Sequence, residues 1–348
     1  MKIVLDDITG KENMYPFSAT RSVADIRIGI LTIREKWQKI FNQEIHTASE
    51  VGLNEDDKNI NIFSARLVPS KQSADSLLKG LKDTRSIFLE YPWHIFQNND
   101  KAIKEDFELI CSGKISQQLS STNKVISPEN IFIEEGAVVE HSILNAYEGP
   151  IYIGRNAIIM EGCLIRGPFA MCEGSILKMG TKVYGATTLG PYCTGGGEIK
   201  NSVLFGYSNK AHEGYLGDSV IGEWCNLGAG TSNSNLKNTA GIVKVWFNES
   251  KEYIPAGTKC GLLMGDYSRS AINTSFNTGT VAGICCNIFA ERFPAKFIPD
   301  FSWGDQQYIL ENALKDIDNW KRLKGKYITH EEIKILTDIY YLQNIKHA

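Results

Sequence analysis

Hydrophobic residues recur at every sixth position through the middle of the chain. These aliphatic or methionine positions are Ile153, Ile159, Ile165, Met171, Leu177, Val183 and Leu189. Four residues after each of them stands a mostly small residue, in the series Ala157, Cys163, Phe169, Ser175, Thr181, Thr187 and Cys193. A period of six fits neither an α-helix nor an alternating strand. It is typical of a parallel β-helix built from hexapeptide repeats, in which stacked coils bury one continuous core. We therefore predict a mainly β protein containing a left-handed parallel β-helix, in preference to an ordinary β-sandwich.

The pattern divides the chain into three predicted parts. Residues 1–122 lack the six-residue period and predict a small α/β module, in which residues 26–41 form a strand running into an amphipathic helix. Residues 125–295 are assigned to the β-helix. Residues 300–348 are predicted to be helical, with Thr329 and Glu332 forming a capping box for a second helix. We expect these helices to cover the open end of the β-helix, where strand edges would otherwise be unpaired.

The six-residue phase breaks twice after Leu189. The inward positions continue as Ile199, Phe205 and Ala211, and then as Tyr215, Ile221 and Leu227. We interpret each break as residues looped out of the coil, and loops on a rigid scaffold often carry function. A longer interruption, residues 233–259, is predicted to be an arm that reaches a neighbouring subunit. The coils resume at Met264 and continue to Ile288.

Composition and charge exclude several classes of protein. The net charge of −3 gives no electrostatic reason to bind nucleic acid or an anionic membrane. The opening MKIVLDDITG has two carboxylates where an export signal needs an apolar core, and no apolar stretch is long enough to span a bilayer. The 8 cysteines form no C-x-x-C pair and several fall on inward positions. We therefore expect buried, reduced thiols in a cytoplasmic protein, without a zinc or disulfide framework.

His212 is the first candidate for chemistry, because it lies between the two phase breaks with Lys210 and Tyr215 beside it. The corner of a β-helix has no structural need for an imidazole. With an ordinary pKa near 6.5, histidine suits the removal of a proton from an attacking amine or hydroxyl near neutral pH. The alternative is a solvated corner residue without a chemical role.

The run from Lys210 to Asp218, KAHEGYLGD, is followed by Asn226-Leu-Gly-Ala-Gly-Thr231 and by Asn235. This arrangement resembles the acetyltransferase half of the bifunctional UDP-N-acetylglucosamine diphosphorylase/glucosamine-1-phosphate N-acetyltransferase family, over residues 182–235 without a gap. The resemblance implies acetyl-CoA-dependent N-acetylation of glucosamine 1-phosphate for UDP-N-acetylglucosamine synthesis. β-Helical prisms of this kind commonly form homotrimers with acyl-transfer sites between subunits.

The resemblance also implies a role for each matched residue. His212 would be the general base, and Lys182 and Lys200 would hold the sugar phosphate. Tyr215 and Asn226 would contact phosphate and sugar, Asn235 would face the acetyl-CoA thioester, and Ala229 would lie against the coenzyme. Lys182 stands where the family has arginine, so the bidentate geometry of a guanidinium is lost there.

Each of these assignments has a plainer alternative. A phosphate dianion attracts cationic donors, which suits two lysines, but solvated lysines at β-helix corners are also ordinary. Asn226 and Asn235 also suit tight corners, because asparagine tolerates a positive φ. Arg269 and Arg292 are candidates for the coenzyme phosphates, or are simply surface arginines.

The N-terminal module departs from the family. The usual diphosphorylase opens with a glycine-rich loop of the form LxxGxGTxM, which is absent here. The segment from Tyr15 to Trp37 instead looks like a divergent sugar-nucleotidyltransferase-like module fused to the same β-helix. Arg21, Arg27 and Lys36 would then bind nucleotide phosphates, and UTP-dependent uridylyl transfer would need Mg²⁺. Asp6, Asp7 and Asp25 are the candidate ligands of that ion. The alternative is a purely structural module.

Two further readings stay open beside acetyl transfer. The protein could be a sugar-1-phosphate nucleotidyltransferase only, or a non-catalytic β-helix that assembles or regulates a partner. A β-helical carbonic anhydrase is excluded, because its zinc needs three histidines and only His141 and His212 fall in the predicted β-helix.

Overall fold

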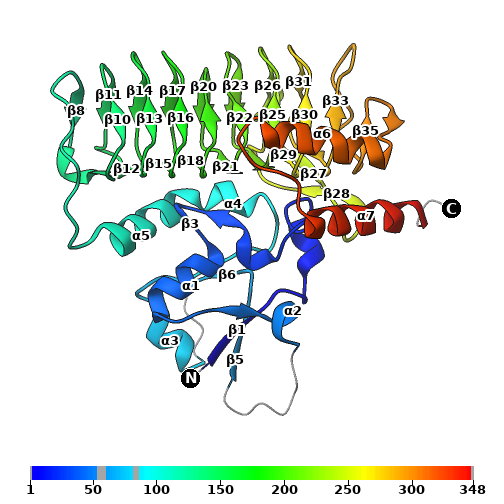
Figure 1. Cartoon of the computed structure of the whole chain (residues 1–348), viewed down its shortest axis with the longest axis horizontal. Coiled ribbons are helices and arrows are strands. Elements are labelled where there is room, and N and C mark those ends of the chain that lie inside the picture. The colour runs from blue at the N-terminus through cyan, green and yellow to red at the C-terminus, as the bar shows by residue number, and fades with distance from the viewer. Residues whose placement is uncertain (1, 53–59, 81–85, 346–348) are drawn as a thin grey trace.

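The computed structural model describes residues 2–52, 60–80 and 86–345. A parallel β-helix runs along the long axis of the molecule, and the N-terminal module lies beneath it (Figure 1). The C-terminal helices lie beside the later coils. The predicted β-helix, α/β module and helical tail are therefore all present.

Three parallel sheets form the sides of the β-helix, and each is named here by its surroundings. The sheet that faces the N-terminal module is the module face. It consists of β9 (Ile131–Ile133), β12 (Ile151–Ile153), β15 (Phe169–Met171), β18 (Thr187–Leu189), β21 (Val203–Gly206), β24 (Val220–Glu223), β29 (Leu262–Met264), β32 (Thr280–Ala282) and β34 (Phe297–Ile298).

The second sheet is the open face, named for its exposed outward side chains, among them Ile126, Ile143 and Leu164. It consists of β8 (Lys124–Ile126), β11 (Ile143–Asn145), β14 (Leu164–Arg166), β17 (Lys182–Tyr184), β20 (Glu198–Lys200) and β23 (Tyr215–Gly217). Beyond it, β26 (Ser232–Asn233) pairs with β31 (Ser275–Phe276).

The third sheet is the flank. It consists of β10 (Val138–Val139), β13 (Ile158–Ile159), β16 (Ile176–Leu177), β19 (Thr194–Gly195), β22 (Asn209–Lys210), β25 (Asn226–Leu227), β30 (Arg269–Ser270), β33 (Asn287–Ile288), β35 (Ser302–Trp303) and β36 (Gln306–Gln307). Only the last pair, β35 with β36, is antiparallel within it.

The six-residue spine is the core of the β-helix, as predicted. All seven spine positions from Ile153 to Leu189 are at most 2% exposed, and the seven positions four residues later are fully buried. Side chains from successive coils pack into one continuous cluster that reaches Ile298. The hydrophobic effect on this single column therefore holds the coils together.

The spine predicted after Leu189 is confirmed at Ile199, Ile221 and Leu227 but wrong at three other positions. The strand register pairs Leu189 with Leu204 and Gly195 with Lys210, while Ile199 pairs with Leu216. The inward residues are therefore Leu204, Lys210 and Leu216, whereas Phe205, Ala211 and Tyr215 were expected. The breaks come from shortened corners rather than from looped-out residues.

The shortest corner lies between Gly195 and Ile199. In the preceding coil the corresponding inward residues, Leu177 and Val183, are six positions apart, but Gly195 and Ile199 are only four apart. Gly196 and Gly197 make this corner, and a Cβ on Gly196 would lie 2.3 Å from the Ala211 carbonyl oxygen. Only glycine allows the two successive coils to approach so closely.

The long interruption forms an antiparallel hairpin of β27 (Lys244–Phe247) and β28 (Glu252–Pro255). It packs on its own chain, so the prediction of an arm reaching another subunit is wrong for these strands. Val243 and Val245 are fully buried in a core shared with the N-terminal module. Gln97 of the module donates a hydrogen bond of 3.0 Å to the Ala256 carbonyl.

The N-terminal module is built on a parallel sheet in which β1 (Lys2–Asp6) lies between β4 (His46–Thr47) and β5 (Ile60–Ser64). The predicted strand-to-helix segment is the hairpin of β2 (Arg27–Ile28) and β3 (Leu31–Thr32) followed by α1 (Ile33–Phe41), which begins with a Thr32–Glu35 capping box. The other elements are η1 (Lys11–Met14), η2 (Val23–Asp25), α2 (Ala48–Val51), β6 (Leu67–Val68), α3 (Ala74–Leu78), β7 (Ile87–Phe88), α4 (His94–Gln97) and α5 (Asn99–Cys111).

The module and the β-helix share one apolar cluster. The rings of Phe17 and Phe205 lie 5.1 Å apart, and both side chains are buried. Asn99 on α5 donates to the Ala186 carbonyl at 2.8 Å, while Thr188 donates to the Gly29 carbonyl at 3.0 Å. The two parts are therefore joined by a core rather than by a linker alone.

The tail forms α6 (Leu310–Arg322) and α7 (His330–Ile345). The predicted capping box is present, because the Thr329 and Glu332 side chains each bond to the other's backbone N–H. The helices pack along one edge of the prism, so the expectation that they cover its end is wrong. Their contacts are with a column of aromatic corner residues, Tyr207, Trp224 and Tyr267, in which Tyr207 and Trp224 stack at 4.2 Å.

All eight cysteines are free and buried, as expected from their positions in the repeats. Within residues 2–52, 60–80 and 86–345, no helix combines the length and the apolar character needed to cross a bilayer.

Candidate functional site

The open face gathers three of the predicted substrate-binding residues. Lys182, Lys200 and Tyr215 lie on the adjacent strands β17, β20 and β23. Each points outward because its strand neighbour, Val183, Ile199 or Leu216, fills the core. The register places Lys182 and Tyr215 on either side of Glu198, and it places Lys200 beside Tyr184.

Tyr184 and Glu198 are hydrogen-bonded to each other, and they lie between Lys182 and Lys200 on the open face. The Tyr184 hydroxyl donates to Glu198 Oε1 at 2.5 Å, and this bond to a carboxylate raises the pKa of Tyr184 to about 12. Lys200 Nζ lies 5.5 Å from the centre of the Tyr184 ring. Lys182 lines a groove of about 450 Å³ together with Tyr184, Arg166 and Leu164. This surface can hold an anion and an apolar neighbour side by side.

Tyr215 belongs to a second polar group at the edge of the open face. Asn235 Nδ2 lies 3.1 Å from the Tyr215 hydroxyl oxygen and also donates to Asp218. Asn201 donates to the other oxygen of Asp218 at 2.7 Å. Burial and the nearby Asp218 carboxylate raise the pKa of Tyr215, so its hydroxyl stays protonated. Asp218 was not predicted as a site residue, although it ends the quoted run KAHEGYLGD.

His212 and Ala229 lie in two consecutive corners that join the flank to the open face. The stacking of these corners is shown by the bond from the Gly230 N–H to the Glu213 carbonyl, at 3.1 Å. His212 is exposed, and within the described part of the chain its imidazole makes no hydrogen bond or ion pair. The side chain is therefore available to a substrate.

Asn226 lies on the other side of this edge. It belongs to β25 on the flank, where Asn209 Nδ2 approaches its amide oxygen at 3.4 Å. One chain therefore brings together Lys182, Lys200, Tyr215 and Asn235, with His212 and Ala229 in the adjoining corners. It does not bring Asn226 onto the same face.

The two coenzyme-phosphate candidates differ in accessibility. Arg269 is only 7% exposed, and its guanidinium carbon lies 5.2 Å from the centre of the Trp320 ring on α6. Arg292 is exposed in the segment after the last complete coil. Arg269 therefore does not offer an open surface for a coenzyme, whereas Arg292 does.

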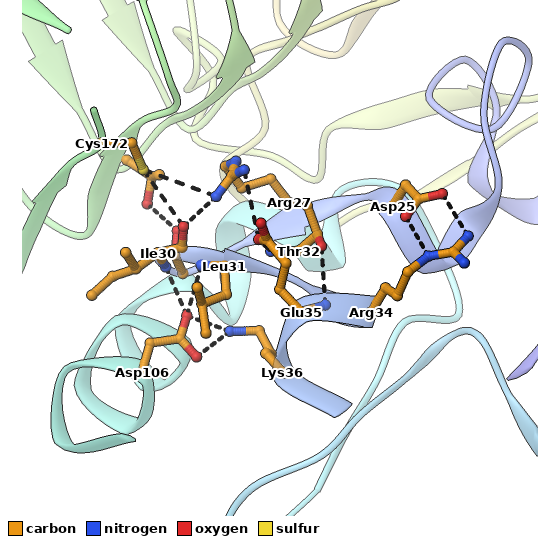
Figure 2. Close-up of polar contacts among 12 residues, drawn as sticks. Asp25, Arg27, Ile30, Leu31, Thr32, Arg34, Glu35, Lys36, Asp106 and Cys172 are labelled. Atoms are coloured by element: carbon orange, nitrogen blue, oxygen red, sulfur yellow. Dashed lines mark hydrogen bonds and ion pairs between the residues drawn. The ribbon is translucent and has the colours of Figure 1, made fainter. Parts of the chain in front are cut away.

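Of the three cations predicted to bind nucleotide, Lys36 is buried inside the module, whereas Arg21 and Arg27 are largely covered where the module meets the β-helix. Arg21 pairs with Asp266 and, at 2.9 Å, with Glu223 of the β-helix. Lys36 pairs with the buried Asp106, and Arg27 donates to the Ile30 carbonyl (Figure 2). Each cation thus has an internal partner, and the structure does not bring the three together around a shared cleft.

The three candidate magnesium ligands are likewise engaged separately. Asp6 accepts the Ile8 and Thr9 N–H groups, Asp7 accepts two bonds from Ser49, and Asp25 pairs with Arg34 at 2.7 Å. Among the described residues, no three carboxylate, histidine or cysteine side chains are grouped as a metal would require. These residues do not fit a magnesium site.

The chain is similar in sequence to several known proteins. Residues 2–82 match the sequence profile of a sugar nucleotidyl transferase family. The bifunctional GlmU protein of Methanocaldococcus jannaschii is 31% identical over 199 residues, which cover 57% of this chain and 42% of that protein. The GlmU protein of Methanococcus maripaludis strain C5 is 30% identical over 195 residues, covering 56% of this chain and 40% of that protein.

A shorter match has a higher identity. A bifunctional sugar-1-phosphate nucleotidylyltransferase/acetyltransferase of Sulfurisphaera tokodaii is 38% identical over 93 residues, which cover 26% of this chain and 23% of that protein. The chain is thus similar to bifunctional transferases, and it joins a β-helix to a module that matches sugar nucleotidyl transferases. More particularly, the chain is GlmU-like, as its motifs predicted. It spans less than half the length of the curated relatives that it matches.

Proposed function

We propose that this chain transfers the acetyl group of acetyl-CoA to the amine of glucosamine 1-phosphate, in UDP-N-acetylglucosamine synthesis. The observation that carries the proposal is the open face, where Lys182, Lys200 and Tyr215 lie on neighbouring strands beside the exposed His212. The two ammonium groups would hold the phosphate. As the amine nitrogen of the sugar attacks the thioester carbonyl, the His212 imidazole would take a proton from that amine.

The remaining residues support the same assignment. Asn235, fixed by Tyr215 and Asp218, would face the thioester, and Ala229 would leave room for the coenzyme in the neighbouring corner. The bond to sulfur then breaks, and coenzyme A leaves as its thiol. Because Asn226 lies on the flank, we propose that a second copy supplies that side of the site in a homotrimer. Ile126, Ile143 and Leu164, which are 41–49% exposed on the open face, would be covered by that copy.

The test is a steady-state assay of thiol release from acetyl-CoA with a panel of amino-sugar phosphates. We expect release with glucosamine 1-phosphate, and a loss of about 10²-fold or more in His212→Ala. His141→Ala is the matched control, because His141 is also an exposed histidine in a corner of the same edge. Full turnover by His212→Ala would show that the assigned base is wrong.

A second candidate function is nucleotidyl transfer by the N-terminal module, which is favoured by the match of residues 2–82 to sugar nucleotidyl transferases. The proposed reaction is uridylyl transfer from UTP to N-acetylglucosamine 1-phosphate. It is tested by pyrophosphate release from UTP with and without added Mg²⁺. The absence of release, with acetyl transfer intact, would leave the module in a structural or regulatory role.

A further inference from the structure

A lysine occupies the interior of the β-helix at a position that other coils fill with apolar residues. On the inner side of the flank, the ladder runs through Ile159, Leu177 and Gly195 to Lys210, and Leu227 follows. Lys210 is 1% exposed. Burying an ammonium group among aliphatic side chains is costly unless strong hydrogen bonds compensate for the lost water. The hydrogen-bond partners of the Lys210 amine therefore show what compensates for its burial.

The amine of Lys210 bonds to two backbone carbonyls, one in the shortened corner and one in the corner of the next coil that stacks on it. Its Nζ donates to the His212 carbonyl oxygen and approaches that of Gly196 at 3.4 Å. Among the described residues, no backbone N–H donates to either of these oxygens. The lysine supplies a donor to these two oxygens from inside the prism.

The contact fixes the corner that carries the candidate base. Gly197 packs on the same carbonyl, since a Cβ there would lie 2.8 Å from the His212 oxygen. The charged side chain that acts on this amine is Glu213, the residue after His212 in the same corner. The His212 backbone is thus held from within while its imidazole faces solvent.

We propose that Lys210 is a positioning residue, which anchors the His212 carbonyl so that the imidazole is fixed toward the open face; this role rests on the acetyl-transfer function proposed above. An apolar side chain would fill the same space, as Leu177 and Leu227 do, but would leave the corner free to move. A displacement of about 1 Å of a general base can lower turnover about 10²-fold, with much smaller effects on substrate binding.

The test compares three variants of the full chain. Lys210→Met keeps the volume and removes the donors, Lys210→Arg keeps a charged donor, and Leu227→Met changes the next residue of the same ladder. We expect Lys210→Met to lower kcat by about 10- to 100-fold, with the KM for the sugar phosphate changed by less than about 3-fold. Lys210→Arg should restore part of kcat, and Leu227→Met should remain near wild type.

Hydrogen exchange measured by mass spectrometry provides a readout that needs no activity. In Lys210→Met, the peptide covering residues 211–218 should exchange at least about 10-fold faster, while peptides from the other corners keep their protection. If Lys210→Met does not fold, Lys210→Gln, with a shorter N–H donor, is measured against the same criteria.

The outcomes separate this role from the proposed reaction. Wild-type kcat, or unchanged exchange of residues 211–218, in a folded Lys210→Met variant would overturn the positioning role while leaving acetyl transfer in place. Absence of acetyl transfer in the wild-type chain would instead refute the proposed function. The exchange measurement would still decide whether Lys210 holds the corner.

Discussion

Phe205→Ala tests whether the module and the β-helix form one cooperative unit. Phe205 points outward from β21, yet it is only 1% exposed because Phe17 and other module residues cover it. Arg21 also lies 5.4 Å from the centre of its ring. Truncation of a buried phenylalanine costs about 3–5 kcal/mol, which includes the lost transfer free energy and the cavity. We take about 4 kcal/mol as the expected loss.

The size of the unfolding unit converts this loss into a shift of melting temperature. With an unfolding entropy of about 2.1 cal/mol/K per residue, one unit of 348 residues would lose about 5 °C. A module of about 120 residues that melted separately would lose about 15 °C in its own transition. Circular dichroism and calorimetry of wild type and variant distinguish these cases, provided that refolding is reversible.

The matched control is Leu164→Ala. Leu164 also points outward from the β-helix, but on the open face, where it is 48% exposed. Its truncation should shift the melting temperature by no more than about 2 °C, unless a neighbouring subunit covers it. Equal, small shifts in both variants would refute the shared core between the module and the β-helix.

Three further predictions concern the site and the interface. Lys200→Ala should raise the KM for the sugar phosphate about 10-fold or more with little change in kcat, because Lys200 would bind a charge that is present in both the ground state and the transition state. Steady-state kinetics measures both constants, with Lys178→Ala as the control, and an unchanged KM would contradict the prediction. A chain starting at Ser127 should aggregate, because loss of the module uncovers Phe205, Val220 and Leu263. If size-exclusion chromatography shows a folded truncation and the acetyl-transfer assay shows that it is active, the two halves are independent. Asp106→Ala should lower the free energy of unfolding by about 3–5 kcal/mol, because it leaves the Lys36 amine buried and unpaired. The double variant Lys36→Met with Asp106→Asn should lower it less, since the amide oxygen still accepts from the Ile30 and Leu31 N–H groups. Denaturant unfolding compares the two variants, and equal losses of stability would contradict the reasoning.

The architecture of the β-helix could be predicted because its signal is local. Each coil repeats the same inward positions, so Ile153 to Leu189 were identified without knowledge of any distant contact. The same method failed where a corner is shortened. A lysine at an inward position breaks the hydrophobic pattern, so Ala211 was placed inside in place of Lys210.

The ion-pair partners of Arg21 and Lys36 could not be predicted from the N-terminal segment in which these two residues lie. Arg21 looked available for phosphate because its partners, Glu223 and Asp266, lie more than two hundred residues away in the sequence. Lys36 likewise meets Asp106 only after α1 and α5 pack together. On the open face, by contrast, the outward positions of Lys182 and Lys200 follow from the repeat, since each stands beside a correctly predicted inward residue, whereas the repeat wrongly placed Tyr215 inside.

One side of the prism is covered by the module, and helices of the same chain follow the later coils at the edge of a second side (Figure 1). The open face, which carries Lys182, Lys200 and Tyr215, is therefore the side that these parts leave free for a large neighbour. The appended parts thus restrict how copies of this chain can be arranged around a symmetry axis. In an assembly of several copies, the module and the C-terminal helices would lie on the outside, and the open faces with their candidate site residues would lie toward the centre.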